Sequence, residues 1–366
     1  RESASAYGVN CSPSAIAAAP NADEGIDWGL ALIFALLESG QSDQARQEMA
    51  ALKRAVPRTR YDAPSRQTRY NGDYQKVMLT DAVLQAYLDN TREAWKKLDA
   101  LLAEAPFNTE LRNNRGSLAL MRGWPRQAAG IFARVKVDEP QAYEASSGLA
   151  SAAMDTYEFD QARQQLDYLD SVRPGWRTLT TLQDRWYWET RPELVVEVGK
   201  DLSGARGAGE QNAWDSQSRL YSSPYGHWRV FAQHNLATAH YSDEGKARYE
   251  AGGLGAQYRD SNGVGEFGLL AALDGSRRGG GFAGYTWTPD DHWSLGFRHE
   301  ENSSDVPLKG RLDDLHGRRS SLALGYRVSD YRSFNLDAAV SSLSDGNLRK
   351  TLGTGWTERW YSGPVY

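Results

Sequence analysis

The sequence predicts an α + β protein in two parts, with a helical repeat array first and a region of long antiparallel strands second. Three prolines, Pro106, Pro140 and Pro174, are separated by a constant period of 34 residues. This period is typical of tetratricopeptide (TPR) repeats, in which every unit is a pair of helices. After residue 191 the apolar residues alternate with polar ones, and this alternation indicates β-strands.

Other positions keep the same period, and helix packing explains them. A small residue on the first helix of each unit lets the second helix approach, while an alanine and a large apolar residue fill the contact. The proline ends the second helix because it has no backbone N–H to donate. These columns are Ala82, Gly116 and Ala150; Ala94, Ala128 and Ala162; and Leu98, Phe132 and Leu166. Because each pair must bury a face against its neighbours, we expect a solenoid with a concave binding surface.

The repeat region is predicted to span residues 25–190, after a lead segment at 1–24. An insertion after the first unit carries Arg58, Arg60, Arg66 and Arg69; we predict a solvated loop, with anion binding as the alternative. Helices are expected at 25–38, 42–56, 73–88, 91–104, 109–121, 125–137, 142–155 and 159–172, and a capping helix at 177–189.

The β region, 191–366, contains roughly ten alternating runs of a length that suits tilted membrane strands. In the clearest run Trp293, Leu295 and Phe297 alternate with polar or small residues. Such runs fit either a sandwich with a dry core or a membrane barrel with a wet lumen. They lie near 193–201, 213–221, 227–240, 246–259, 264–274, 280–288, 292–301, 318–328, 333–342 and 349–361.

Two observations favour the barrel over the sandwich. The polar face carries more charges than a dry core accepts. Aromatic residues also fall near strand ends, as they do in the interfacial girdles of membrane barrels. These aromatic residues are Trp214, Trp228, Tyr258, Trp287, Trp293, Trp356 and Trp360.

Composition excludes several classes of protein. The net charge of −5 does not favour a nucleic-acid partner. The mean hydropathy of −0.64 and the lack of a long apolar run argue against a transmembrane helix. With Cys11 as the single cysteine, a disulfide scaffold and a cysteine-based zinc site are both excluded. No cofactor is implied.

No catalytic constellation is found, so we expect a protein without enzymatic activity. His299, Glu300 and Glu301 are consecutive, but successive strand residues point to opposite faces and form no metal cage. The glycines at 279–281 are not followed by a helix, as a phosphate-binding loop would require.

Several segments resemble the poly-N-acetylglucosamine export porins of the PgaA/HmsH family. In the repeats these are 122–128 (RGWPRQA) and 157–163 (YEFDQAR). In the β region they are 191–197 (RPELVVE), 223–229 (SPYGHWR) and 358–361 (ERWY). The resemblance covers about residues 25–366, in the order of the family.

The resemblance implies periplasmic TPR repeats followed by a 16-stranded outer-membrane barrel that exports partly deacetylated poly-β-1,6-N-acetyl-D-glucosamine for the biofilm matrix. About ten strands cannot close such a barrel, so the chain is expected to be a fragment. The implied partners are the polymer, a periplasmic polysaccharide deacetylase and outer-membrane lipid. An exporter of another polysaccharide, such as cellulose, is one alternative; a soluble TPR adaptor with a glycan-binding sandwich is the other.

Candidate binding residues follow from TPR geometry and from strand alternation, because a cationic polymer should meet weak acidic and aromatic contacts. Ordinary solvation is the alternative for the groove residues, and structural ion pairs are the alternative in the lumen. The groove candidates are Asp27, Tyr87, Glu110, Asn113, Glu144 and Asp155, and the lumen candidates are Glu197, Asp215, Glu266, Arg298, Glu300, Arg327 and Asp337.

Overall fold

The computed structural model of the chain describes residues 22–200, 210–242, 244–276 and 278–360. Most of the predicted lead segment and the terminal Tyr366 lie outside these residues. The chain divides into two compact units. The first comprises 1–122, 131–141 and 359–366, and the second comprises 123–130 and 142–358.

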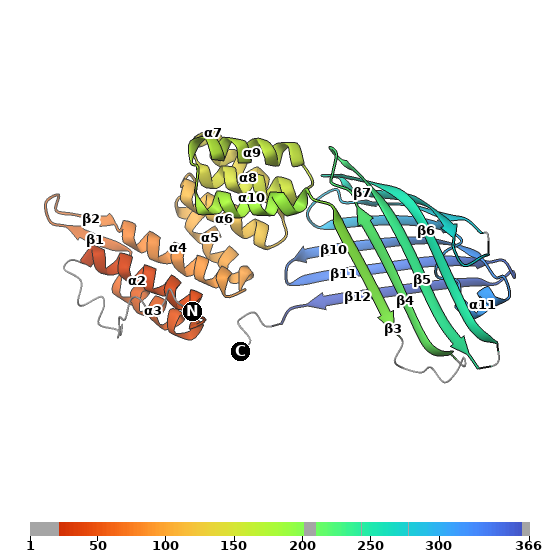
Figure 1. Cartoon of the computed structure of the whole chain (residues 1–366). Helices are drawn as coiled ribbons and strands as arrows, with labels where there is room; N and C mark the ends of the chain where they lie inside the picture. Colours follow the sequence, from red (N-terminus) through yellow and green to blue (C-terminus); the bar gives the residue numbers. More distant parts are fainter. Residues whose placement is uncertain (1–21, 201–209, 243, 277, 361–366) are drawn as a thin grey trace. The chain divides into compact units, whose positions relative to one another are not determined.

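The first unit contains helices α2 to α6, arranged as consecutive antiparallel pairs (Figure 1). Asn71 and Asn108 cap α4 and α6, because each side chain accepts a hydrogen bond from a backbone N–H of the first turn. Two buried clusters fill the seams, one around Ile33 and Met49 and the other around Leu98. The helices are α2 (Ala22–Glu38), α3 (Ser42–Ala55), α4 (Gly72–Tyr87), α5 (Thr91–Glu104) and α6 (Thr109–Met121).

The basic insertion, predicted as a solvated loop, is exposed and contains regular structure. It forms a hairpin of β1 (Thr59–Asp62) and β2 (Gln67–Tyr70), in which Arg60 pairs with Arg69. Arg66 has a φ of 54° at the tip, within the left-handed region that tight turns need. The sequence did not predict this strand pair, but the exposure of the insertion agrees with the prediction.

The remaining helices are α7 (Pro125–Asp138), α8 (Tyr143–Asp155), α9 (Phe159–Val172) and α10 (Arg177–Glu189). The first of these belongs partly to each unit, and the other three belong to the second. The periodic columns are buried as predicted: Ala82, Ala94, Ala128, Ala150 and Ala162 are all inaccessible to solvent. The predicted helix-packing role of these residues is therefore confirmed.

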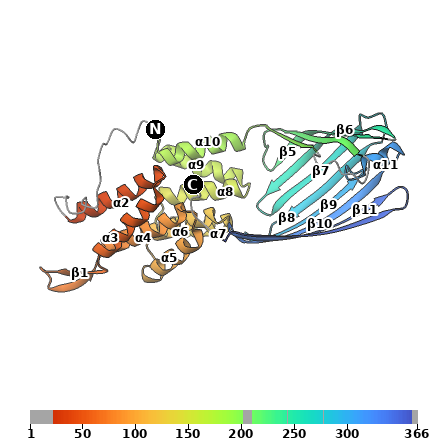
Figure 2. The ribbon, with the colours of Figure 1, turned by 90° about the horizontal axis from the view of Figure 1, so that it is seen from below.

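The second unit also holds one sheet of ten antiparallel strands in sequence order. Figure 2 shows that this sheet curves into an open trough. β3 and β12 form its two edges, so the sheet is not closed. Among the residues that the structure describes, the second unit has no other sheet to pack against it, as a sandwich would require. The strands are β3 (Glu193–Lys200), β4 (Glu210–Tyr221), β5 (Trp228–Tyr241), β6 (Gly245–Asp260), β7 (Gly263–Ala272), β8 (Gly280–Trp287), β9 (Trp293–Glu301), β10 (Gly317–Ser329), β11 (Arg332–Leu343) and β12 (Leu348–Glu358).

The loop between β9 and β10 contains a short helix, α11 (Leu308–Leu312), that the sequence did not predict. Its Arg311 lies over the ring of Tyr249 on β6, and its Lys309 forms an ion pair with Glu244. Five helical residues are too few to show a helical period, which is why the sequence gave no signal.

The change from helix to strand falls between Glu189 and Glu193. The compact units run across this boundary, because the last helices pack on turns of the sheet. The predicted division at 190/191 therefore marks the change from helix to strand. That the two sides are domains that fold separately stays a prediction. Within the described residues, no helix combines the length and hydrophobicity needed to cross a membrane.

Candidate functional site

Strand register places all the predicted lumen residues on one face of the sheet, called here the inner face. Residues directly opposite each other in an antiparallel pair share a face. Glu197 lies opposite Gln217, and Glu266 lies opposite Gln257. Continuing the register across the sheet puts Asp215, Arg298, Glu300, Arg327 and Asp337 on the same face.

The opposite, outer face is apolar and exposed, as a surface against lipid would be. An aromatic row follows one end of this face, in which Trp293, Tyr326, Phe334 and Trp356 are consecutive partners across four strands. Such a row is typical of a membrane interface. Exposed apolar residues of this face include Leu194, Val196, Leu254, Leu269, Phe297, Leu322, Leu336 and Leu352.

The inner face carries an ion-pair ladder. Glu266 accepts from Arg219 at 3.3 Å and forms an ion pair with Arg298 at 3.6 Å. Arg298 also donates to Glu300 at 2.6 Å. The structure thus brings Glu266, Arg298 and Glu300 together, and for these three the structural alternative of cross-strand ion pairs is observed.

An aromatic cluster lies beneath this ladder. Tyr221, Phe231 and Phe282 are buried together on the inner face. The Arg298 guanidinium lies 4.3 Å from the Phe282 ring centroid, and the Arg229 guanidinium lies 3.7 Å from that of Tyr221. Cations over aromatic faces are attracted electrostatically. The sequence analysis missed this cluster, because it assigned the apolar residues to the outer face alone.

Four predicted lumen residues, Arg327 and three acidic residues, are not in the ladder. Glu197, Asp215 and Asp337 are exposed on the inner face, and none of them has an ion-pair partner among the described residues. Their carboxylates are available to a cationic ligand, whereas those of Glu266 and Glu300 are already neutralised by arginines. Their role in binding stays a prediction.

The groove candidates are divided between the two compact units. Asp27, Tyr87, Glu110 and Asn113 belong to the first, whereas Glu144 and Asp155 belong to the second. Most of them are exposed, and Asn113 is half-buried. Asp27 pairs with Lys76 at 3.5 Å, Tyr87 meets Phe34 edge to face, and Asp155 accepts from Arg185 at 2.6 Å. Glu110 and Glu144 therefore remain the better candidates for an electrostatic contact.

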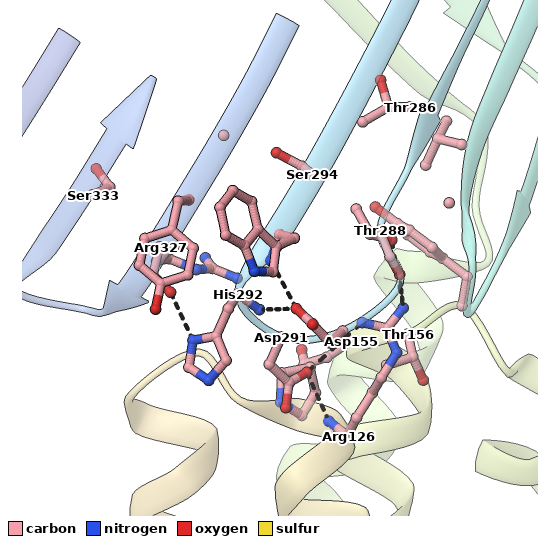
Figure 3. Close-up of a pocket in the computed structure, with 18 of the residues that line it drawn as sticks. Arg126, Asp155, Thr156, Thr286, Thr288, Asp291, His292, Ser294, Arg327 and Ser333 are labelled. Atoms are coloured by element: carbon pink, nitrogen blue, oxygen red, sulfur yellow. Dashed lines mark hydrogen bonds and ion pairs between the residues drawn. The ribbon is translucent and has the colours of Figure 1, made fainter. Parts of the chain in front are cut away.

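A cavity of about 500 Å³ lies where the helices of the second unit meet the turns of the sheet (Figure 3). Its lining combines acidic, aromatic and hydroxyl groups. Asp155 ends α8 and Tyr157 lies in the turn that follows it, whereas Asp260, Trp293 and Ser294 come from the strands. We call this the mouth cavity. Arg327, a predicted lumen residue, also lines it.

Arg126 and Asp291 join the helices to the sheet beside the mouth cavity. Asp291 accepts from the backbone N–H groups of Arg126 and Gln127 at 3.0 and 2.9 Å, at the start of α7. A carboxylate at a helix N-terminus satisfies N–H groups that have no partner within the helix. The Arg126 guanidinium in turn donates to the carbonyl oxygen of Thr288 (Figure 3). It also donates to the carbonyl oxygen of Ser261.

The sequence analysis gave neither Arg126 nor Asp291 a structural role. The two residues are far apart in the chain, and nothing in the sequence signals their pairing. The hydrogen bonds that the neighbouring turn residue Asp290 accepts were not predicted either. Its carboxylate accepts from the backbone N–H groups of Trp293 and His292, and these bonds, that from Trp293 above all, hold its pKa below the ordinary value.

The fold and its two faces define the class of protein: helical repeats followed by an antiparallel sheet of membrane-barrel type. Among the residues that the structure describes, no His, Cys, Asp and Glu side chains cluster as metal ligands would.

The profile of the PgaA membrane beta barrel domain matches residues 189–366, a range that includes every strand from β3 to β12. Over these residues the chain is similar to the PgaA membrane β-barrel domain family. The resemblance noted from sequence motifs is therefore confirmed, and so are the membrane barrel and its location in the outer membrane.

Curated relatives agree with this assignment. The chain is 24% identical over 283 residues to the poly-beta-1,6-N-acetyl-D-glucosamine export protein of Escherichia coli K12, and the same values hold for that of strain O157:H7. The match covers 76% of this chain and 35% of each relative. The chain thus spans about a third of the length of these relatives. An export protein agrees with the expectation of no enzymatic activity.

Two solved structures are similar to parts of the chain. A bacterial polysaccharide outer membrane secretin is 22% identical, with a TM-score of 0.41, and the match covers 48% of this chain and 59% of that one. A tetratricopeptide repeat protein from Parabacteroides merdae is 15% identical, with a TM-score of 0.31, over 43% of this chain and 57% of that one. Scores at this level add nothing to the assignment.

Proposed function

We propose that the chain is part of an outer-membrane porin that exports partly deacetylated poly-β-1,6-N-acetyl-D-glucosamine for a biofilm matrix. The observation that carries the proposal is the family match over the whole β region, together with the name of the curated relatives. The polymer passes along the inner face of the barrel, and the helical repeats lie in the periplasm.

The charges of the inner face suit a weakly bound cationic polymer. Removing acetyl groups from glucosamine leaves amines that are positively charged at neutral pH. Glu197, Asp215 and Asp337 offer such amines exposed carboxylates, two on neighbouring strands at one edge of the sheet and the third near its other edge. The arginines of the ladder limit the net negative charge, so no single position holds the polymer tightly. Weak, repeated contacts favour conduction over trapping.

The helical repeats guide the polymer and dock a periplasmic deacetylase in this proposal. TPR arrays bind extended ligands or partner proteins on the surface formed by their first helices. Glu110 and Glu144 lie in the first turns of such helices, α6 and α8, and both are exposed. We assign the polymer contacts to these two carboxylates.

Titration calorimetry of the chain in detergent tests this proposal. The ligands are β-1,6-linked glucosamine oligomers, either partly deacetylated or fully acetylated, at two salt concentrations. We expect the deacetylated oligomer to bind more tightly, with a preference that shrinks at high salt because screening weakens exposed charges. The double variant Glu110→Lys and Glu144→Lys should lose this preference by roughly tenfold or less, since each exposed contact contributes below about 1 kcal/mol.

Asp160→Lys with Asp167→Lys on α9 is the matched control, because it makes the same charge change at exposed residues of a second helix. Equal losses in both double variants would contradict the assignment to the first helices. A cellulose oligomer serves as a third ligand. Binding of that neutral polymer in preference to both glucosamine oligomers would favour the alternative of an exporter for another polysaccharide.

A further inference from the structure

The turns between paired helices repeat one conformation. Asp89, Gly123 and Tyr157 follow one another at intervals of 34 residues, and their φ values are 61°, 73° and 62°. Only a left-handed residue lets the chain reverse so tightly after the first helix. Every such turn therefore presents its backbone and its neighbouring side chains in the same way.

The sheet carries a second repeated device at the ends of its strands. His227 and Trp228 precede and begin β5, and they face Tyr258 and Arg259 at the end of β6. The His227 ring nitrogen Nδ1 lies 2.8 Å from the Arg259 carbonyl oxygen, and Trp228 packs on Tyr258 at 4.9 Å between ring centroids.

The same four residue types recur at β9 and β10. The His292 Nδ1 lies 2.8 Å from the Arg327 carbonyl oxygen, and Trp293 packs on Tyr326 at 4.5 Å between ring centroids. We call these two sets of residues the β6 module (His227, Trp228, Tyr258 and Arg259) and the β10 module (His292, Trp293, Tyr326 and Arg327).

The β10 module meets the turn at Gly123. Arg327 donates to the Gly123 carbonyl oxygen at 3.3 Å, and a Cβ at Gly123 would stand 3.3 Å from the Arg327 guanidinium carbon. Trp124, the next residue, donates from Nε1 to the Val328 carbonyl oxygen at 3.1 Å. Its ring also packs against His292 at 5.6 Å between centroids.

The β6 module meets the next turn, one repeat later. The Arg259 guanidinium lies 4.7 Å from the ring centroid of Tyr157 and 5.5 Å from that of Phe159. Glu158 is the counterpart of Trp124 in the period, and it accepts from the Ser261 backbone N–H at 3.3 Å. Arg259 is only 8% exposed. Water therefore solvates its charge little, and the aromatic faces of the turn help to stabilise that charge.

The spacing of the two modules fits the spacing of the repeats. β6 and β10 are four strands apart, which corresponds to about 19 Å at the usual inter-strand distance of ~4.8 Å. Consecutive inter-helix turns are two helices apart, which also corresponds to about 19 Å at ~9.5 Å per helix. Two rigid modules can therefore hold two consecutive turns without distortion of either part.

We propose that the last two helical repeats are docked on the barrel by these two modules, each of which takes one inter-helix turn. The modules fix the register of the repeats on the sheet. The mouth cavity lies between them, since Tyr157, Asp260, His292 and Arg327 all line it, so this docking sets the entrance to the inner face. In the first unit the equivalent turn residue, Asp89, likewise accepts from an arginine that directly follows a strand, Arg359.

Pulsed electron spin resonance on the whole chain in detergent tests the docking. Spin labels replace two exposed residues, Gln164 on α9 and Ser344 after β11, in a Cys11→Ser background. We expect one narrow distance distribution in this labelled protein. The double variant Arg259→Ala and Arg327→Ala should broaden the distribution at least twofold, because both modules lose the group that holds their turn.

Two comparisons keep the test decisive. Arg248→Ala with Arg318→Ala removes two arginines from the same strands at their other ends, and it should leave the distribution narrow. Trp124→Phe with Tyr157→Leu weakens the docking from the helix side without touching the barrel, and it should broaden the distribution. An unchanged width in the Arg259 and Arg327 variant, or in the helix-side variant, would overturn the proposal. No polymer is used, so the outcome is independent of the proposed export function.

Discussion

At the scale of single residues, Asp291 caps a helix from a distant part of the chain. Its side chain is 6% exposed and accepts from two backbone N–H groups of the first turn of α7. A cap supplied by the residue that precedes the helix would not connect α7 to any other part of the fold. A cap supplied by a turn of the sheet couples the start of the helix to the barrel.

Replacing Asp291 should weaken the first turn of α7. In Asp291→Ala two N–H groups lose their acceptor, and losing a cap usually costs about 1–2 kcal/mol. Hydrogen exchange of the Arg126 and Gln127 amides should accelerate by roughly tenfold as a result. Asp291→Asn, which keeps one acceptor oxygen, is the matched control and should show a smaller effect. Equal exchange in the alanine variant and the unmodified protein would disprove the capping role.

Asp290, the preceding residue, should make its turn sensitive to acid. Hydrogen bonds from Trp293 and His292 lower the pKa of Asp290, so its stabilising effect is complete above the unfolded value of about 3.9. The effect disappears as the pH falls through the still lower pKa of the folded protein. We expect the Trp293 amide to lose exchange protection below about pH 4. Asp290→Asn should lack this step, and a loss of protection that begins at higher pH would contradict the explanation.

At the scale of helices and strands, the 34-residue period rests on close contacts such as that of Gly116. A Cβ at this position would lie 2.6 Å from the ring of Phe132 on α7, which is fully buried. The contact explains why a large apolar residue in one column goes with a small residue in another.

Gly116→Ala should therefore destabilise the helical repeats by about 1–3 kcal/mol, the usual effect of overpacking a core. Gly130→Ala on α7 is the control, since no atom lies within 4 Å of a Cβ there. It should stabilise the helix by about 0.5–1 kcal/mol. Chemical denaturation followed by circular dichroism measures both. Adding Phe132→Leu should restore part of the loss in Gly116→Ala, and a neutral Gly116→Ala would show that the ring moves aside freely.

Much of the fold could be predicted from the sequence because regular elements have regular periods. The predicted helix at 159–172 matches α9, and the predicted strand at 292–301 differs from β9 by one residue at its start. Strand alternation also placed Glu197 and Asp337 on one face, as the register confirms. These predictions succeed because they use only residues that are close together along the chain.

Features that depend on distant contacts could not be predicted. The cap from Asp291 to α7 joins residues about 165 positions apart, and no local pattern records it. The same holds for the contact of the Arg259 guanidinium with the Tyr157 ring. The β1–β2 hairpin was not predicted for another reason. Its strands of four residues are too short to establish a period of two.

At the scale of the whole molecule, the sheet separates two environments. The outer face is apolar with an aromatic row. The inner face carries ion pairs and, among the described residues, three exposed acids without an ion-pair partner. The β region matches the profile of a membrane barrel domain. In such barrels the outer face meets lipid and the inner face meets water. The proposed export of a cationic polymer uses the inner face only.

The most direct test measures the poly-N-acetylglucosamine released by cells in which the gene for this protein carries Glu197→Lys, Asp215→Lys and Asp337→Lys. We predict a several-fold loss of released polymer with an unchanged amount of protein in the outer membrane, and a smaller loss for the neutral variants Glu197→Gln, Asp215→Asn and Asp337→Asn. Undiminished release in the lysine variant would contradict the electrostatic path, and undiminished release after deletion of the gene would contradict the export function itself.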